Sequence, residues 1–408
     1  MSKPVRLGPF KGMSNVNPSG NDINTPHIVL NADVTKEGLL VKRPGYELWC
    51  ALPGAHSLVA DASMMLCADA TQLYAVQAGV ASSLGAVNSA GKLNYVRVDD
   101  VVYFSGAACC GTYNLSTGVL GDWGLQVPDA PVLSETVGGL PPGRYTVAVT
   151  VESEGVQSGA SEDAVIELGS TGGILLSGLP ANCTVWLTEP DGSVLFRSSE
   201  TSLLTTTPQT TEPLVSSYCH PALNFTSLCH ANSRIYGSVG STVYRTKPLQ
   251  YQLFDGLWQV QAPSEVNLIA KSDGVLYLGC EDGTYLLFDG SEKKVFKKVG
   301  PASVAGSLQY CNGLGDLEDA MTQHTKTLND VPVWLTIDGF VAGLPSGRLA
   351  NLSKSKVKVF PGTKSAASAF VFNNNVFKYL ATFKRSESSA VGFSDSATCE
   401  VVRNGKVI

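Results

Sequence analysis

Short apolar strands that alternate with tight turns recur along most of the chain, and this repetition limits the fold more than any single motif. Six segments share one plan: a short apolar strand, a turn with Asp or Asn, a second strand rich in Tyr, Val or Leu, and then a Gly. They span residues 57–79, 93–118, 225–256, 266–290, 331–353 and 365–383. One hairpin buries a single face, whereas radially stacked copies bury both faces and leave few open edges. The pattern therefore predicts an all-β fold whose body is a β-propeller of six or seven blades.

The turns inside these segments have the chemistry of tight hairpins. Asp or Asn followed by Gly or another polar residue tolerates the positive φ that a two-residue reversal requires. The predicted reversals are Asp99-Asp100, Asp273-Gly274, Asp282-Gly283, Asp338-Gly339 and Asn374-Asn375.

The series of hairpins is interrupted between the second and third segments. A proline-bounded stretch, Val127 to Pro131, opens a region of short alternating strands with frequent turn signals. This spacing is typical of an immunoglobulin or fibronectin type III β-sandwich. We predict an N-terminal wrapping arm with the first blades over residues 1–127, an inserted sandwich over 128–212, and the remaining blades with a closing strand over 213–408. Within the arm, a hairpin is expected near residues 28–49.

The composition excludes several classes of protein. Hydrophobic residues make up 44% of the chain and charged residues only 16%, and no apolar run is long enough to cross a bilayer. The net charge of −6 argues against tight wrapping of nucleic acid, although a passage that DNA merely slides through remains compatible with it. The ten cysteines are expected to be reduced and largely buried, since no signal peptide is visible. The five tryptophans are expected in the core: Trp49, Trp123, Trp186, Trp258 and Trp334.

No catalytic motif is present, and we predict that the chain is not an enzyme and holds no cofactor. Two Cys-His pairs, Cys219-His220 and Cys229-His230, consist of zinc-binding residue types. Their spacing lacks the short loop of a structural zinc site, so ordinary buried or edge positions are favoured and no metal site is predicted.

Two charged clusters are candidate contact sites. The acidic cluster of Asp316, Glu318 and Asp319 lies in a polar stretch that is either a solvated loop or an acidic loop lining a channel. The lysines of the KKVFKK run either protect an exposed strand edge or contact DNA or an acidic neighbour. They are Lys293, Lys294, Lys297 and Lys298.

The N-terminal stretch resembles the opening of phage virion proteins of the tail-nozzle or packaged-DNA-stabilisation family. That opening combines an apolar Asn-Ala-Asp segment, a Gly turn and an Arg-Pro-Gly-Tyr sequence. The matching residues here are Asn31, Asp33, Gly38, Arg43, Pro44, Gly45 and Tyr46. The stretches GRYTVAVTVESEGVQSGAS, HANSRIYGSVGSTVYRTKPLQYQLFD and WLTIDGFVAGLPSGRLANLS are similar to the inserted sandwich, the following blade and a late blade of that family, in the same order.

The resemblance implies a structural virion protein of a bacteriophage tail, made in the host cytoplasm. In that family a ring, usually of six copies, closes and conducts the DNA exit channel below the portal and adaptor, and fibres or tailspikes attach to its outside. The implied partners are therefore other copies of the chain, portal, adaptor or other tail proteins, fibres or tailspikes, and double-stranded DNA in transit. Two alternatives stay open: a tail-tip or baseplate protein that binds a receptor or serves as an adaptor, and a propeller glycosidase.

Overall fold

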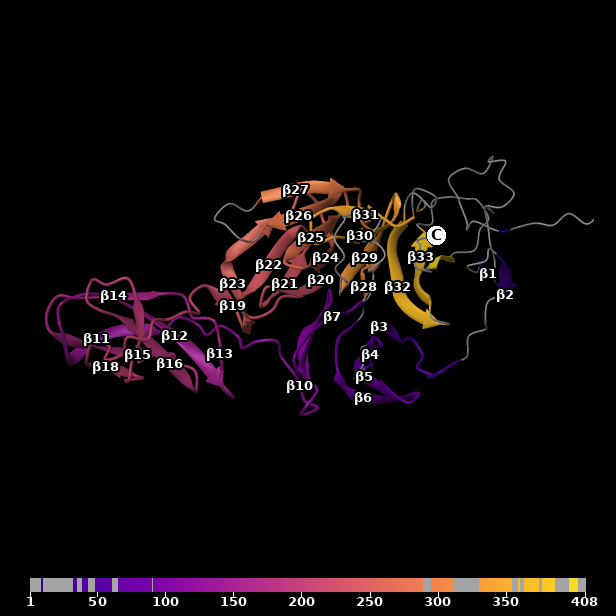
Figure 1. Cartoon of the computed structure of the whole chain (residues 1–408). Helices are drawn as coiled ribbons and strands as arrows, with labels where there is room; N and C mark the ends of the chain where they lie inside the picture. Colours follow the sequence, from indigo (N-terminus) through magenta and orange to yellow (C-terminus); the bar gives the residue numbers. More distant parts are fainter. Residues whose placement is uncertain are drawn as a thin grey trace, which may run out of the picture. The chain divides into compact units, whose positions relative to one another are not determined.

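The computed structural model describes residues 9, 32–34, 39–42, 48–60, 65–89, 91–288, 295–311, 330–353, 359, 363–373, 376–385 and 396–402. These residues form β-strands joined by turns and loops and contain no helix, which confirms the all-β prediction (Figure 1). The chain divides into two compact units. The first unit comprises residues 1–51 and 262–408, and the second comprises residues 52–261. The predicted boundaries after residues 127 and 212 stay a prediction.

Three antiparallel sheets of the second unit follow the predicted hairpin segments, and each is a meander of consecutive strands. The first holds β3 (His56–Ala60), β4 (Met65–Ala68), β5 (Gln72–Gln77) and β6 (Val80–Ala86). The next holds β7 (Asn94–Val98), β8 (Val101–Ser105), β9 (Cys110–Asn114) and β10 (Leu120–Gly121). In the third, β20 (Ser227–Ala231), β21 (Arg234–Val239), β22 (Thr242–Lys247) and β23 (Gln250–Gln261) are joined by β19 (Cys219–His220) beyond β23.

The first unit repeats the same plan in three further sheets. One contains β24 (Val266–Ser272), β25 (Val275–Cys280), β26 (Thr284–Phe288) and β27 (Val295–Gly300). The next contains β28 (Gln309–Cys311), β29 (Val331–Thr336), β30 (Gly339–Gly343) and β31 (Leu349–Asn351). The last contains β32 (Thr363–Asn373), β33 (Val376–Arg385) and β34 (Ser396–Val402). The expected N-terminal hairpin is confirmed by the antiparallel pairing of β1 (Ala32–Val34) with β2 (Leu40–Lys42).

The predicted turns are confirmed in part. Asp99 (φ 50°) reverses the chain between β7 and β8, and Asp273 (φ 43°) with Gly274 (φ 84°) does so between β24 and β25. Between β29 and β30 the two connecting residues are Ile337 and Asp338, one position earlier than expected, because Gly339 already pairs with Thr336. Asp282 lies in a longer connection between β25 and β26, so that reversal is not a two-residue turn. Asn374 and Asn375 lie outside the described residues.

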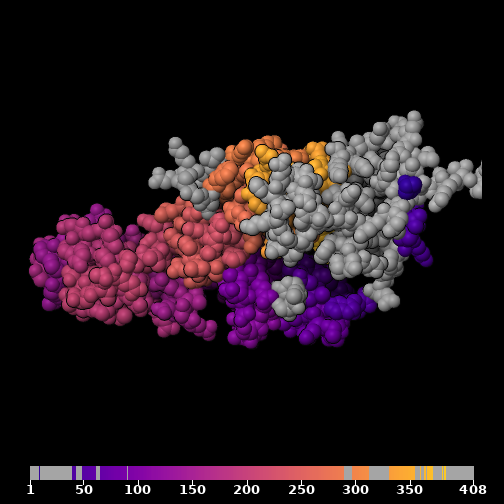
Figure 2. Space-filling model, viewed as in Figure 1, coloured from indigo at the N-terminus to yellow at the C-terminus, as the bar shows by residue number. Residues whose placement is uncertain are grey.

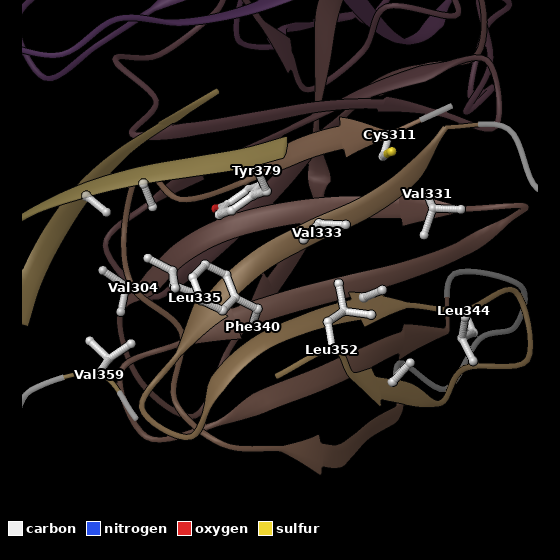
Figure 3. Close-up of a cluster of buried hydrophobic side chains, with 14 residues drawn as sticks. Val304, Cys311, Val331, Val333, Leu335, Phe340, Leu344, Leu352, Val359 and Tyr379 are labelled. Atoms are coloured by element: carbon white, nitrogen blue, oxygen red, sulfur yellow. The ribbon is translucent and has the colours of Figure 1, made fainter. Parts of the chain in front are cut away.

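Apolar clusters fill the space between consecutive meander sheets within each unit. In the second unit, Leu73 packs with Phe104 between the first two sheets, and Val98 packs with Phe254 between the next two. In the first unit, Leu268 packs with Trp334. Figure 3 shows the following cluster, in which Phe340 and its neighbours from β29–β31 face Tyr379 of β33. A sheet with a neighbour on each side thus buries both of its faces, as the repeated hairpins predicted.

Residues 132–204 form two sheets packed face to face. One holds β11 (Val132–Leu140), β15 (Gly172–Ser177) and β18 (Leu203–Leu204). The other holds β12 (Gly143–Ser153), β13 (Val156–Gln157), β14 (Ala164–Leu168), β16 (Cys183–Thr188) and β17 (Leu195–Arg197). Both sheets contribute to one core, with Ile174 and Leu204 from the first and Tyr145, Val147 and Leu187 from the second. These residues therefore make a two-layer sandwich. It is the part coloured magenta to pink in the space-filling view (Figure 2).

The strand order of this sandwich differs from the immunoglobulin order. In an immunoglobulin sheet of strands C, F and G, the central strand follows one of its two neighbours in the chain. Here β12 lies between β14 and β16 and precedes both of them. The Tyr145 hydroxyl, at the start of β12, donates a hydrogen bond of 2.8 Å to the Pro141 carbonyl oxygen, four residues earlier in the chain.

We expect Tyr145→Phe to destabilise the sandwich by about 0.5–1.5 kcal/mol, the usual contribution of one hydrogen bond. The ring stays in the core, but the Pro141 carbonyl oxygen loses its partner. Chemical denaturation followed by a probe in the sandwich measures the change. Tyr218→Phe serves as the matched control because Tyr218 is 62% exposed. Equal stability of Tyr145→Phe and the wild type would contradict a structural role for the hydroxyl.

The tryptophan and cysteine predictions are largely confirmed. Four of the five tryptophans are buried, but Trp49 is 55% exposed and is not a core residue. The nine cysteines whose side chains are described are thiols. Five of them are buried: Cys67, Cys219, Cys229, Cys280 and Cys311.

Candidate functional site

The first strands of consecutive meander sheets are tied together in the second unit by side-chain hydrogen bonds. The backbone N–H of Leu93, just before β7, donates to the Ser57 hydroxyl of β3 at 2.7 Å. The Asn94 side-chain amide of β7 donates to the Thr226 carbonyl oxygen, just before β20, also at 2.7 Å. The strands β3, β7 and β20 therefore form a row in which each contacts the next.

The first unit contains an equivalent row. The Asn267 side-chain amide of β24 donates to the Ser303 carbonyl oxygen at 2.9 Å, and the Gln309 amide of β28 donates to the Ser368 carbonyl oxygen of β32 at 2.7 Å. A parallel bridge between Ala305 and Ser365 adds a backbone link. In each unit a side-chain amide thus bridges neighbouring first strands, and these two rows are the candidate functional site.

The first strands of the six meander sheets carry few charged residues. The sequences of β3, β7, β20, β24, β28 and β32 contain no Asp or Glu. Their Lys and Arg residues are Arg97, Lys271 and Lys364. The predicted acidic residues Asp316, Glu318 and Asp319 lie outside the described residues.

The lysine run is placed at a sheet edge. β27 is the last strand of its sheet, and Lys297 and Lys298 on it are both exposed. The Lys298 ammonium group lies 3.8 Å from an Asp282 carboxylate oxygen and donates to the Asp282 carbonyl oxygen at 2.7 Å. Lys298 is therefore engaged within its own sheet, and both roles of the lysine run, edge protection and contact with DNA or an acidic neighbour, stay predictions. Lys293 and Lys294 lie outside the described residues.

Of the N-terminal family-like motif, the structure describes Asp33, which pairs with Val41 in the β1–β2 hairpin. The other residues of the motif lie outside the described part of the chain: Asn31, Gly38, Arg43, Pro44, Gly45 and Tyr46.

The two Cys-His pairs do not share one site. Cys219 and His220 lie on β19, whereas Cys229 and His230 lie on β20, and these strands are the two opposite edges of one five-stranded sheet. Four inter-strand spacings separate them, about 19 Å, which is far beyond the reach of a single zinc ion. Among the residues that the structure describes, no group of three or more His, Cys, Asp or Glu is arranged to hold a metal. Within the same residues, no helix has the length and apolar character needed to span a membrane.

Two equivalent turns each hold a hydrogen-bonded carboxylate: that of Asp69, which the sequence patterns did not single out, and that of Asp282, which they placed in a predicted reversal. Asp69, between β4 and β5, accepts hydrogen bonds from the backbone N–H groups of Thr71 and Gln72 and from the Tyr74 hydroxyl, at 2.7–2.8 Å. These bonds lower the pKa of Asp69 to about 2, with the Thr71 backbone bond as the largest cause. Asp282, between β25 and β26, has a lowered pKa for the same kind of reason, since the Ser264 and Tyr285 hydroxyls donate to it.

We expect Asp69→Asn to destabilise the chain at neutral pH and to flatten its acid denaturation profile. A carboxyl group with a folded-state pKa near 2 and an ordinary value of 3.8 stabilises the fold above the ordinary value, and this stabilisation is lost as the pH falls toward 2. Thermal melting between pH 7 and pH 2 measures both effects. Asp129→Asn, at an exposed linker position, is the control. If the melting temperature of Asp69→Asn changed with pH in parallel with that of the wild type, a stabilising role of the ionised Asp69 carboxylate would be contradicted.

The sandwich is fastened to the sheet of β19–β23 by buried backbone contacts. Ala160 donates its backbone N–H at 3.1 Å to the carbonyl oxygen of Ser216, which lies just before β19. Gly159 packs so closely that a Cβ added to it would lie 1.9 Å from the Cys219 carbonyl oxygen. This junction leaves no room for a side chain at residue 159.

No protein-family model matches the chain, and no curated protein matches it. Solved structures similar to it include Kluyveromyces lactis Hsv2, with a TM-score of 0.28 and 8% identity over 84% of this chain and 94% of that one. Saccharomyces cerevisiae Sqt1 has a TM-score of 0.29 and 10% identity over 76% of this chain and 74% of that one. The N-terminal domain of Nup159 has a TM-score of 0.30 and 10% identity over 82% and 73%. Likenesses at these TM-scores carry no argument about fold or function.

Proposed function

We propose that the chain is a non-enzymatic structural protein of a bacteriophage tail, and that its six meander sheets are the blades of one propeller interrupted by an immunoglobulin-like sandwich. In this proposal, copies assemble into a ring that closes and conducts the DNA exit channel and anchors neighbouring tail proteins or fibres. The observation that carries it is the repeated stacking of meander sheets, with their first strands linked in rows by Asn94, Asn267 and Gln309. In a propeller the first strand of each blade lies nearest the central axis.

The low net charge of the chain supports passage of DNA rather than tight binding of it. A chain with a net charge of −6 contributes little to the counterion release that drives tight DNA binding. The docked sandwich supports an anchoring role because its junction with the β19–β23 sheet is buried rather than a loose linker. The order of family-like motifs in the sequence supports the tail assignment itself.

A tail-tip receptor-binding protein is the second candidate, and the threonine-rich stretch of the sandwich bears on it. Several of these threonines are engaged internally: the Thr205 backbone and hydroxyl bond to Glu200, and the Thr210 hydroxyl donates to the Arg197 carbonyl oxygen at 2.9 Å. These bonds leave less of the stretch available for recognition and favour the anchoring role.

Electron cryomicroscopy of virions that carry the chain tests the proposal. We expect a ring of six propeller bodies around a channel within the tail, with sandwiches projecting from it. A protein that never enters particles would contradict the tail assignment. Blocking of adsorption by an antibody to the sandwich would favour the receptor-binding alternative, and turnover of cell-surface polysaccharide would favour the glycosidase.

Because the chain is 16% charged, we expect ring assembly to respond weakly to ionic strength. Interfaces built from uncharged polar and apolar groups lose little energy when salt screens charge. Sedimentation of the ring across a salt series measures this. Dissociation by moderate salt alone would show that ion pairs hold the ring together.

A further inference from the structure

The strand β6 differs from the other strands that end the meander sheets. β10 has two residues and β31 has three, while β27 carries Lys297 and Lys298. β23 is partly covered by β19, and β34 contains Glu400. These are the usual protections against edge-to-edge pairing. β6 has seven residues, VASSLGA, without a charge or a proline.

The open side of β6 lies at the surface. β6 is an end strand of its sheet, and among the described residues its strand partner is β5. Val80 is 65% exposed, and Ser82, Ser83 and Ala86 are exposed as well. The sheet that contains β6, coloured indigo to purple, reaches the molecular surface in Figure 2. The segments that flank β6 in the sequence are also uncharged. The last charged residue before β6 is Asp69, and the first one after it is Lys92.

The hairpin geometry shows which backbone groups of β6 point outward. Ala78 and Gly79, with φ of 49° and 81°, form the two-residue turn, and Gln77 pairs with Val80. In such a turn the N–H of the fourth residue bonds back to the first carbonyl, so the Val80 N–H faces β5. Antiparallel pairing alternates, so the N–H and C=O groups of Ala81 and Ser83 face away from β5. The register shift in the β5–β6 pairing comes after Ser83 and leaves this stretch regular.

We propose that the outward edge of β6 is an interface between two copies of this chain, which pair antiparallel about a two-fold axis through Ser82. This register joins Ala81 of each copy to Ser83 of the other through their outward backbone groups. It places Ser82 opposite Ser82, within the regular part of β6 that ends at Ser83. A two-fold contact must be self-complementary, and an uncharged strand of small residues meets itself without like charges opposite one another. The proposal is independent of the proposed tail function.

Sedimentation of the full chain over a concentration series, together with charged variants at the axis, tests this register. We expect the wild type to dimerise. Ser82→Lys and Ser82→Glu, each alone, should weaken the dimer at least tenfold, because like charges then face each other across the axis. An equimolar mixture of the two variants should restore dimers. Ser170→Lys, in an exposed turn of the sandwich, is the control and should dimerise like the wild type.

A second variant removes a hydrogen bond without adding charge. Ala81→Pro deletes an outward N–H and leaves the β5–β6 bonds in place, so the fold should persist by circular dichroism while the dimer weakens. Hydrogen exchange should show that the amides of Ala81 and Ser83 gain protection as concentration rises. A wild type that stays monomeric, or Ser82→Lys with wild-type dimerisation, would overturn the proposal. The proposal would also be overturned if the chain stayed monomeric and the amides of Ala81 and Ser83 were protected from exchange only after an unrelated strand-forming peptide was added.

Discussion

Trp334→Ala should cost about 3–5 kcal/mol of stability, the range for truncating a fully buried large aromatic side chain. Trp334, on β29, has 0% exposure and packs between two sheets of the first unit. Its ring lies 5.6 Å from that of Tyr277, centroid to centroid, and close to Gly343. Tyr277 in turn donates its hydroxyl hydrogen bond to the Leu344 carbonyl oxygen at 2.6 Å. Removal of the indole therefore leaves a cavity at the point where these two sheets meet.

Chemical denaturation of the full chain measures this effect, and the chain provides its own matched control. Trp49→Ala makes the same substitution at a site that is 55% exposed, so we expect a change within about 0.5 kcal/mol. Trp334→Phe should fall between the two because it keeps a ring in the cavity. Comparable losses for Trp334→Ala and Trp49→Ala would show that the two sheets do not depend on this contact.

Gly159→Ala should open the junction between the sandwich and the β19–β23 sheet, at a cost of about 1–3 kcal/mol. A Cβ at this position would lie 1.9 Å from the Cys219 carbonyl oxygen and 3.0 Å from a Val127 methyl group. The Cys219 carbonyl oxygen belongs to the backbone of β19 and cannot rotate away, so the segment itself must move. The hydrogen bond from the Ala160 N–H to the Ser216 carbonyl oxygen should then be lost.

Hydrogen exchange separates undocking from unfolding. In Gly159→Ala we expect faster exchange at the Ala160 amide and unchanged protection at Val147 in the sandwich core. Gly169→Ala is the control, since a Cβ there meets nothing within 4 Å. Unchanged exchange at Ala160 would contradict a tightly packed junction. Loss of protection at Val147 would show that the sandwich needs its docking to fold.

The sequence anticipated those features that depend on residues close together in the chain. Alternating apolar residues and Asp- or Asn-containing turns predicted the meander sheets and their order, because a hairpin is decided by its own turn and strands. The reversal at Asp99 and that at Asp273 illustrate this. The turn between β29 and β30 shows where local prediction fails. It was predicted at Asp338-Gly339 but lies at Ile337-Asp338, because register depends on cross-strand pairing and not only on the turn residues.

Features that join distant residues were decided by the tertiary structure. The bond from Asn94 to Thr226 spans the whole inserted sandwich, and no local pattern signals it. Gly159 looks like an ordinary loop glycine until Cys219 is placed against it. Trp49 is as apolar as Trp334, yet one is exposed and the other is buried, because burial depends on what packs around a side chain and not on its own hydrophobicity.

By itself, then, the sequence determined that this protein is built from repeated antiparallel hairpins with a sandwich between the second and third. The tertiary structure decided the strand order of that sandwich, the amide-linked rows of first strands, and the location of the unprotected edge at β6. The physical reason is one of range. Turn chemistry and side-chain alternation act over a few residues, whereas sheet stacking, close backbone approach and open edges exist only once distant segments have met.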